Sequence, residues 1–404
     1  MKEPKSRRIR LAVLITHPVQ YFQPVFAALA CDPRLDLHVV FGCDHGIRVS
    51  HDPDFGLSFA WDCAPTEGFS HSFASDASLE DLSKWSCAWP LAWRALKQIR
   101  RFGPDRVLVF AYTPIFITLA TLILRQEGIP LMLRADGTDR AFPRSPLRSL
   151  IKDLILRFWY SQFTCVFPIG SDSDDHFARL GVTAHRRHSV SYAVNTAFFA
   201  EQVKRWSPER DRLRREFGMN SADLVLLWSA KMTQVKHPQL LIDALQQMEA
   251  VVRRRFWLLA MGDGPLRASF ESQARDVLAD RCCFLGFRNQ KELGAGYAAA
   301  DALVFPSRQG ETWGLVVNEA LQFGLAVLAS DHPGCVRDLL IKRQDAPAGS
   351  AVFRSDDAPA LANALHEMAS LYPKGFVQLP VDSLPEPEDL AETVAAKLCE
   401  SMGN

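Results

Sequence analysis

The sequence predicts an α/β protein with two doubly wound domains that face each other across a cleft. Short β-branched runs alternate with amphipathic helical stretches along both halves, which is the pattern of βαβ units around a parallel sheet. The 404 residues are too many for one ordinary core and fit two domains of roughly 200 residues each. Hydrophobic residues make up 48% of the sequence, enough for either half to bury a full sheet.

Each expected strand is a short apolar run between helical stretches. In the first half, strands are expected at residues 10–15, 37–41, 106–110, 130–134 and 165–169. In the second half, they are expected at residues 224–229, 257–261, 282–285, 302–305 and 326–329, with helices at 238–248 and 314–323 among those between them.

The domain boundary is expected near residues 195–220, a charged stretch without strand character. This boundary gives a first domain at 1–195 and a second at 196–380. Residues 381–404 are predicted to form a helix after a Pro-containing linker and to pack back across the domains. In open α/β sheets ligands bind beyond the carboxyl ends of the strands, so these ends are where we expect the site.

Charge and cysteine content argue against several classes of protein. The 46 basic residues balance 46 acidic ones, whereas a nucleic-acid-binding protein would carry an excess of Lys and Arg. Nine cysteines without a Cys-x-x-Cys pair are typical of free thiols in a reducing compartment. The apolar run at 11–15 is too short for a signal peptide, and the run at 114–124 is too short to span a membrane. We therefore expect a cytoplasmic protein.

The segment 301–334 is the richest in candidate binding residues. After a buried strand it enters a polar loop and then a helix for which Thr312 can serve as the N-cap. The amides of Trp313, Gly314 and Leu315 would then point outward and, with the helix dipole, form a phosphate site.

Two carboxylates flank this helix start, with Glu311 just before it and Glu319 within it. A carboxylate is a poor neighbour for phosphate but a good acceptor for sugar hydroxyls, so the pair indicates a nucleotide sugar. The alternative is that Glu311 complements the helix dipole and Glu319 is a solvated helix residue.

Lys231 and Lys236 follow the strand expected at 224–229 and precede a helix. Breaking a bond to a nucleoside diphosphate builds negative charge on the leaving phosphate, and cations placed there stabilise it without a metal. Alternatively, both are solvated surface lysines.

The second half resembles glycosyltransferase family 4, a retaining family with the GT-B fold of two Rossmann-like domains. The matching motifs run in family order over about residues 224–340: Lys231-x4-Lys236, MGDGPLR at 261–267, FLGF at 284–287, YAAAD at 297–301, Pro306-Ser307 and Glu311-x7-Glu319. By this resemblance the second domain binds the nucleotide sugar and the first faces the acceptor.

The resemblance implies a role for each matched residue. Glu311 would contact hydroxyls of the donor sugar, Glu319 the ribose, and Lys236 the diphosphate. Lys231 stands where the family usually has Arg, so a forked donor becomes a point charge. The backbone near Phe287 and Arg288 would face the nucleobase. For Gly262, the preferred interpretation is that it only shapes a turn.

The first half carries THPVQYFQP at residues 16–24, which resembles a branch of family 4 with an N-terminal His-Pro-x-Gln-Tyr motif; FGLSFAWD at 55–62 fits the same branch. His17 and Gln20 are then expected to face the cleft, although a His-Pro turn is also an ordinary structural stop. Arg134 and Asp136 end another strand and are expected to point towards the cleft as well. The family often has His on this loop, and Asp136-Gly137 is also ordinary turn chemistry.

No metal or other cofactor is expected. The Asp-x-Asp match at 52–54 lacks a preceding buried strand, and the one at 172–174 is explained by a helix start. In residues 144–159, basic residues at 144, 148, 152 and 157 accompany an apolar face. Such a helix can lie on anionic lipid and bring a lipid-linked acceptor to the cleft. The alternative is a helix whose apolar face packs on the core.

The expected function is retaining transfer of a sugar from a nucleotide sugar to an acceptor hydroxyl on a glycan or lipid-linked acceptor, in polysaccharide, lipopolysaccharide or glycolipid assembly. No nucleic-acid partner is expected, and the protein could sit at the inner face of the membrane. Two alternatives stay open: a GT-B-type nucleotide-sugar epimerase, and a non-catalytic sugar-nucleotide-binding protein.

Overall fold

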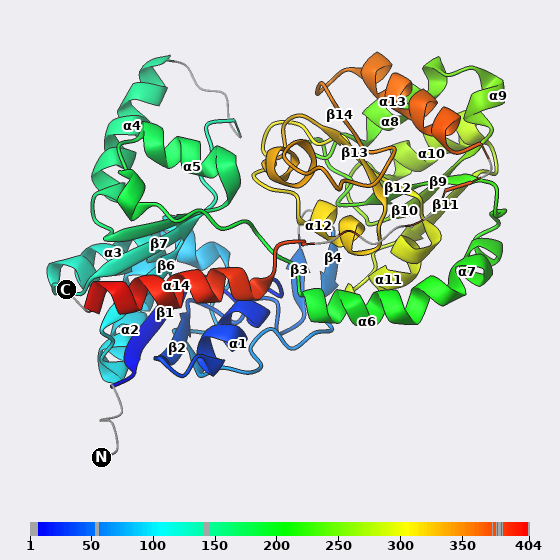
Figure 1. Cartoon of the computed structure of the whole chain (residues 1–404). Coiled ribbons are helices and arrows are strands. Elements are labelled where there is room, and N and C mark those ends of the chain that lie inside the picture. The colour runs from blue at the N-terminus through cyan, green and yellow to red at the C-terminus, as the bar shows by residue number, and fades with distance from the viewer. Residues whose placement is uncertain are drawn as a thin grey trace.

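The chain folds into two α/β domains, each with a six-stranded sheet (Figure 1). The structure is a computed structural model and describes residues 7–402 except 53–55, 141–145, 374, 377, 379, 380 and 382. None of the helices in this described part is long and apolar enough to cross a membrane.

The N-terminal sheet has the strand order β5-β2-β1-β6-β7-β8, and every neighbouring pair is parallel. Its strands are β1 (Ile9–Ile15), β2 (Leu35–Phe41), β5 (His71–Phe73), β6 (Arg106–Phe110), β7 (Leu131–Ala135) and β8 (Cys165–Pro168). A short antiparallel hairpin of β3 (Ser50–Asp52) and β4 (Leu57–Phe59) stands apart from this sheet.

Both faces of the N-terminal sheet are buried by helices. One face packs against α2 (Trp85–Phe102), α3 (Ile115–Gln126), α4 (Pro146–Tyr160) and α5 (Gly170–Arg179). The other packs against α1 (Gln23–Cys31) and α14 (Pro387–Met402), the helix that returns from the C-terminal end of the chain. Because both faces are covered, the strands are apolar along their whole length.

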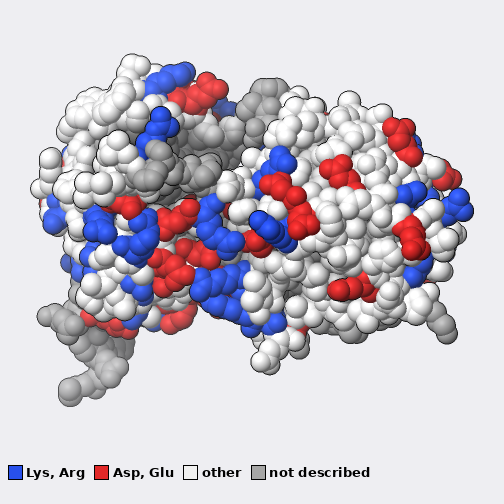
Figure 2. All heavy atoms as spheres, turned by 90° about the horizontal axis from the view of Figure 1, so that it is seen from above, with Lys and Arg blue, Asp and Glu red and all other residues white. Residues whose placement is uncertain are grey.

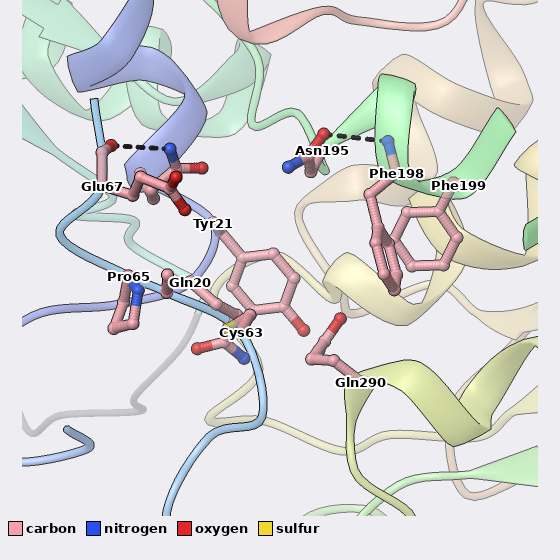
Figure 3. A pocket seen from close by; sticks show the side chains of 11 residues that line it. Gln20, Tyr21, Cys63, Pro65, Glu67, Asn195, Phe198, Phe199 and Gln290 are labelled. Carbon is pink, nitrogen blue, oxygen red and sulfur yellow. Dashed lines mark hydrogen bonds between the residues drawn. The ribbon is translucent and has the colours of Figure 1, made fainter. Parts of the chain in front are cut away.

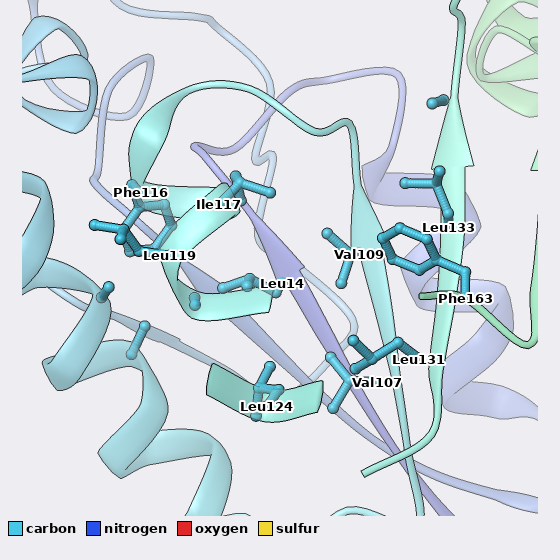
Figure 4. Close-up of a cluster of buried hydrophobic side chains, with 14 of the residues drawn as sticks. Leu14, Val107, Val109, Phe116, Ile117, Leu119, Leu124, Leu131, Leu133 and Phe163 are labelled. Atoms are coloured by element: carbon cyan, nitrogen blue, oxygen red, sulfur yellow. The ribbon is translucent and has the colours of Figure 1, made fainter. Parts of the chain in front are cut away.

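Alternate residues of β1 enter different cores. Leu14 joins Val107, Val109, Leu131 and other side chains under α3, whereas its neighbours on the strand face α1 and α14. Figure 4 shows the first of these clusters, with Leu14, Val109 and Leu133 directed towards the side chains of α3. Each fully buried aliphatic side chain contributes about 1.5–3 kcal/mol, which fixes the sheet and so the positions of its strand ends.

The C-terminal sheet repeats the same topology, with the order β11-β10-β9-β12-β13-β14 and only parallel pairs. Its strands are β9 (Leu224–Ser229), β10 (Phe256–Met261), β11 (Cys282–Gly286), β12 (Ala302–Phe305), β13 (Ala326–Ser330) and β14 (Ala351–Phe353). In each domain the first strand is central and the order reverses beside it, which is the doubly wound arrangement.

Helices again cover both faces of this sheet. One face carries α8 (Pro238–Gln247), α10 (Arg267–Leu278) and α13 (Ala358–Leu371). The other carries α6 (Thr196–Trp206), α7 (Arg210–Glu216), α11 (Gln290–Ala299) and α12 (Leu315–Gln322). The remaining short elements are α9 (Ala250–Arg253), three 3₁₀ turns (Glu80–Ser83, Ala184–Arg186 and Ser207–Glu209) and a π turn (Arg337–Ile341).

The sequence predictions of the strands are confirmed, with each expected strand present and its bounds shifted by no more than two residues. The strands that were not predicted are β3, β4, β5 and β14. Each has only three residues, too few for a periodic pattern to be recognised.

Candidate functional site

A cavity of about 140 Å³ lies at the carboxyl ends of β9, β10 and β11, beside α12. It is lined by Tyr21, Trp61, Ser229, Ala230, Met261, Gly262, Phe287, Arg288, Gln290, Leu293, Val316 and Glu319. Four of the residues predicted for donor binding therefore meet in one cavity: Gly262, Phe287, Arg288 and Glu319. Tyr21 and Trp61 come from the N-terminal domain, so the cavity lies between the domains.

Glu319 is buried in this cavity wall and is not the solvated helix residue of the alternative interpretation. Tyr21 donates a hydrogen bond to Oε1 at 3.0 Å, and Tyr297 donates to Oε2 at 2.5 Å. Burial raises the pKa of Glu319 to about 7, although the two tyrosine hydroxyls oppose this shift. The carboxylate thus joins the two domains through Tyr21.

Lys236 and Glu311, predicted as separate ligand-binding groups, form an ion pair with each other. The ammonium also lies 5.2 Å from the centre of the Phe305 ring, and Ser307 Oγ lies 3.5 Å from Glu311 Oε2. Both side chains are largely buried, at 23% and 13% exposure, so water screens this pair less than a surface pair. Lys231 is half-buried in the loop after β9.

The prediction that Thr312 caps the helix is wrong. The helix α12 begins at Leu315 after Gly314, which has a φ of +104° and serves as the N-cap without a side-chain hydrogen bond. The Thr312 hydroxyl instead donates to Asp136 Oδ2 at 2.9 Å, across the two domains. The amides of Leu315 and Val316 still lie in the first turn, where they have no intrahelical acceptor.

Gly314 and Trp313 have packing roles beside the helix start. A Cβ on Gly314 would lie 2.5 Å from the Phe305 ring, so a larger residue does not fit. The Trp313 side chain is buried at 2% exposure, and its indole N–H donates to Asn318 Oδ1. Its ring lies edge-on to Tyr192 at 6.1 Å. The indole of Trp313 therefore belongs to the core between the domains, and only its backbone remains a candidate phosphate ligand.

Gly262 does more than shape a turn. Its φ is +126°, and a Cβ there would lie 2.1 Å from the carbonyl oxygen of Ala230. The close approach of these two backbone segments forms part of the cavity wall, since both residues line it.

Arg134 does not point towards the cleft as predicted. Its guanidinium is buried at 2% exposure and donates to the carbonyl oxygens of Pro168 at 3.1 Å, Val190 at 2.6 Å and Ser191 at 3.3 Å. Burial lowers the pKa of Arg134 to about 10. The side chain thus runs sideways to the end of the neighbouring strand β8 and to the segment at 190–191, where its N–H groups are satisfied by backbone carbonyls.

Asp136 lines a second cavity of about 150 Å³ at the carboxyl ends of β6 and β7. The other side chains around it include Tyr112, Lys152, His176 and Thr312. This cavity therefore lies on the N-terminal side, where the acceptor is expected, and Lys152 brings α4 to its edge.

His17 and Gln20 lie in the loop between β1 and α1. Burial and the nearby His45 lower the pKa of His17 to about 4, so its imidazole is neutral at pH 7. Gln20 lines a cavity of about 190 Å³ together with Tyr21 and Gln290. Figure 3 shows the amides of Gln20 and Gln290 near the Tyr21 hydroxyl, so Gln20 supports the residue that reaches Glu319.

Ion pairs and polar contacts join the domains along one further seam. Asp338 accepts a hydrogen bond from the Ser171 amide at 2.7 Å, and Arg337 lies 3.3 Å from Asp172. Figure 2 shows that Lys and Arg side chains lie beside Asp and Glu side chains on the face seen from above. Within the described ranges no group of three or more His, Cys, Asp or Glu residues could hold a metal ion. In the Asp-x-Asp match at residues 52–54, Pro53 and Asp54 lie outside the described residues.

Most of the apolar face of α4 is exposed. The alternative interpretation, in which this face packs on the core, is therefore wrong for most of the helix. Its outward apolar residues are 53–68% exposed: Leu147, Leu150, Ile151, Leu154, Ile155 and Phe158. Only its last turns reach the core, through Leu156, Trp159 and Tyr160. Arg148 and Arg157 are exposed on the same helix, and Arg144 lies outside the described residues.

Sequence reasoning missed Tyr21, Trp61, Gln290 and Tyr297 as cavity or carboxylate contacts. Three of them lie within recognised motifs: Tyr21 ends His-Pro-x-Gln-Tyr, Trp61 belongs to FGLSFAWD, and Tyr297 begins YAAAD. The signal was present, but nothing local indicated which of these side chains meet.

Known proteins with similar sequences include glycosyltransferases. Residues 209–374 match the family model of glycosyl transferases group 1. A sulfoquinovosyl transferase of Arabidopsis thaliana is 26% identical over 265 residues, 64% of this chain and 49% of that protein. A D-inositol 3-phosphate glycosyltransferase of Catenulispora acidiphila is 29% identical over 226 residues, 51% of each chain. The chain thus spans about half the length of these curated relatives.

Solved structures are similar over nearly the whole chain. HepE of Anabaena, in complex with UDP and glucose, gives a TM-score of 0.64 at 15% identity and covers 98% of this chain and 100% of its own. WaaG, a glycosyltransferase involved in lipopolysaccharide biosynthesis, gives 0.62 at 17% identity and covers 95% and 99%. The predicted GT-B fold is confirmed.

The match to glycosyl transferases group 1 covers the C-terminal domain, and the solved structures share the fold of nearly the whole chain. The matched residues 209–374 include Lys231, Lys236, Glu311 and Glu319.

Proposed function

We propose that this protein is a retaining glycosyltransferase of family 4 that moves a sugar from a nucleotide sugar to an acceptor hydroxyl. The observation that carries this proposal is the donor arrangement at one sheet edge. A cavity with a buried carboxylate, Glu319, reaches the first turn of α12 at Val316 and lies at the same edge of the C-terminal sheet as the Lys236–Glu311 pair, whose members follow β9 and β12.

Each group has a distinct task in the proposed reaction. The nucleoside occupies the cavity, with its ribose hydroxyls on Glu319. The diphosphate lies between Lys231, Lys236 and the first-turn amides of α12, where cations and N–H groups stabilise negative charge. Glu311 leaves its ion pair with Lys236 to accept hydroxyls of the transferred sugar, while Lys236 turns to the phosphate.

The bond changes balance without an added base. The acceptor oxygen forms a bond to the anomeric carbon, and the bond from that carbon to the diphosphate oxygen breaks. The electron pair of the broken bond stays on the leaving phosphate, which takes the acceptor proton. Both events occur on the same face of the sugar, so configuration is retained. Asp136 lines the cavity on the acceptor side and positions the acceptor.

A panel of nucleotide sugars tests this proposal, beginning with UDP-sugars because a similar structure holds UDP. Release of nucleoside diphosphate is measured with and without a glycan or lipid-linked acceptor extract. Release that requires the acceptor supports transfer. Interconversion of the nucleotide sugar alone indicates an epimerase, and binding without turnover indicates a non-catalytic protein; either would contradict the proposal. Loss of release in Glu311→Gln ties the reaction to this site.

We also propose that the acceptor is lipid-linked and that α4 holds the protein on the inner face of the membrane. The six outward apolar residues recur at three- and four-residue spacing, which forms one continuous stripe on a helix. Arg148 and Arg157 are exposed beside this stripe and add positive charge, as expected for a helix that lies on anionic lipid. Lys152 and Leu156 of α4 line the cavity of Asp136, so the lipid surface would adjoin the acceptor site.

Cosedimentation with vesicles of neutral lipid, with and without anionic lipid, tests this contact. The wild type is expected to bind anionic vesicles, and Leu150→Glu/Leu154→Glu to lose binding. Leu371→Glu, at an exposed position on α13, is the matched control and should bind as the wild type does. Self-association through α4 in place of vesicle binding, detected by light scattering, would contradict the membrane contact.

A further inference from the structure

An aromatic segment of the N-terminal domain, residues 59–62, lies against the donor cavity of the C-terminal domain. It begins at the last residue of β4, and its Trp61 lines the cavity together with Phe287 and Arg288. The segment belongs to the FGLSFAWD motif, whose residues have no role in the proposed reaction. Phe55 of this motif lies outside the described residues.

Four contacts hold the segment to the loop after β11. The rings of Phe59 and Phe287 have centroids 4.4 Å apart. Asn289 Nδ2 donates to the carbonyl oxygen of Ala60 at 2.8 Å, and Asn289 Oδ1 lies 3.4 Å from the Asp62 amide. The amide of Lys291 donates to Asp62 Oδ2 at 3.1 Å. The segment is therefore docked by both apolar and polar contacts.

The docking partner is itself rigid. Asn289 is the N-cap of α11, where it forms a capping box with Glu292. Capping boxes satisfy two otherwise unpaired amides and fix the path of the chain into the helix. On the other side of the segment, Trp61 packs against Gly46, where an added Cβ would lie 3.1 Å from its ring. The indole also lies edge-on to the ring of Phe59, with centroids 5.1 Å apart, so neighbours in the N-terminal domain hold it at the cavity wall.

The cavity wall beside Trp61 contains an unsatisfied donor. Arg288 Nε is buried and has no hydrogen-bond partner among the described residues, while Nη1 of the same side chain is held by Glu292 at 3.2 Å. Buried polar groups are normally hydrogen-bonded, so this N–H is suited to a ligand carbonyl. Nucleobases combine such a carbonyl with a flat aromatic face.

We infer that Trp61 binds the donor nucleobase by packing on its face, and that the segment 59–62 makes donor binding depend on contact between the two domains. The inference rests on the proposed function and extends it, because the donor site then needs a residue from the acceptor-side domain. Base–aromatic stacking is worth a large factor in affinity and tolerates different bases. Arg288 would supply the contact that depends on the identity of the base.

Calorimetric binding of UDP, GDP and ADP to the full chain tests this inference. For the nucleoside diphosphate that binds the wild type, Trp61→Ala is expected to weaken binding by about tenfold or more, as removal of a stacking ring does. Trp61→Phe keeps a ring and should stay within about threefold. Leu371→Ala, which removes an exposed apolar side chain on α13, should bind as the wild type does.

Kinetics separate this binding role from a structural one. For Trp61→Ala, the donor KM should rise about tenfold while kcat at saturating donor stays within about twofold. Equal diphosphate affinity in the wild type and Trp61→Ala would overturn the inference and leave the proposed function intact. Failure of the wild type to bind any of the three diphosphates would overturn the donor site, and this inference with it. Equal losses in Trp61→Phe and Trp61→Ala would show that packing of the segment, not stacking, is what matters.

Discussion

The two domains share one topology but use their sheet edges differently. Both sheets have the same strand order, and in both the ends of the strands near the centre line a cavity. The C-terminal edge presents charged groups, with Lys236 paired to Glu311 and Glu319 in the cavity wall. The N-terminal edge buries its Arg134 under backbone carbonyls and keeps His17 neutral by lowering its pKa. A shared fold therefore places a site without deciding its chemistry.

The outer surfaces of the two domains differ as well. In the C-terminal domain, the large exposed apolar residues are scattered, as at Val251, Ile341 and Leu371. In the N-terminal domain they gather along α4, and Trp85, Trp89 and Trp93 form a second exposed row on α2. Single exposed apolar residues are normal on a soluble protein, whereas a continuous stripe marks a contact surface. Among the described residues, the continuous exposed apolar surface is therefore a feature of the N-terminal domain.

The largest expected effect tests the charged edge of the C-terminal domain. Lys236→Ala and Glu311→Gln should each lower kcat by about a hundredfold or more, since each removes a group that acts on developing charge or on the transferred sugar. Steady-state release of nucleoside diphosphate measures the loss. Lys397→Ala breaks a more exposed Lys–Glu pair on α14 and serves as the control. Unchanged turnover in both site variants would show that this edge is not the reaction centre.

The next effect tests whether Arg134 is structural. Arg134→Met should reduce the free energy of unfolding by about 3 kcal/mol, because buried carbonyls lose a charged donor. Urea denaturation followed by circular dichroism gives this value. Arg125→Met, at an exposed position near the end of α3, should change stability little. An intact stability with a raised acceptor KM would instead return Arg134 to the acceptor site.

A pH dependence of the free energy of unfolding, similar in size to the Arg134 effect or smaller, tests the raised pKa of Glu319. The folded-state pKa of about 7 exceeds the ordinary 4.5, so the folded protein holds a proton that the unfolded chain has released. The stability from this group is therefore full below pH 4.5 and is lost as pH rises through about 7. The loss amounts to about 3 kcal/mol at most.

Unfolding midpoints between pH 4 and 8 measure this dependence. Glu319→Gln cannot titrate at this position and should show a flatter profile than the wild type over the same range. Parallel profiles of the two proteins would mean that folding does not shift the pKa of Glu319.

The smallest effect concerns the bond between the domains at Thr312. Thr312→Ala should cost about 1 kcal/mol of stability, the typical net value of one hydrogen bond, and leave kcat within about twofold. Asp136→Ala removes the same bond together with the carboxylate in the acceptor-side cavity. Its kcat should be about tenfold below that of Thr312→Ala, measured by the same release assay. Equal kcat values for the two variants would limit Asp136 to the bond.

Much of the fold was predictable because its signals are local. Apolar runs such as 224–229 and 302–305 give strands whose bounds the structure reproduces. Strands of three residues were missed because they hold too little pattern. The start of α12 was misplaced for a different reason: Thr312 has the side chain of a cap, but the helix begins after the left-handed Gly314, and the hydroxyl finds Asp136 in the other domain.

The sequence by itself determined the two doubly wound sheets and placed the residues predicted for donor binding near strand ends, since hydrophobic periodicity and motif spacing act over short distances. Only the tertiary structure decided which of these residues meet. Tyr21 and Glu319 are 298 positions apart and form a hydrogen bond only because the two domains dock. The same docking brings Trp61 to the cavity at the carboxyl ends of β9, β10 and β11, while packing within the N-terminal domain turns Arg134 away from the cleft. Contacts of this kind depend on the relative positions of separately folded sheets, which no local pattern encodes.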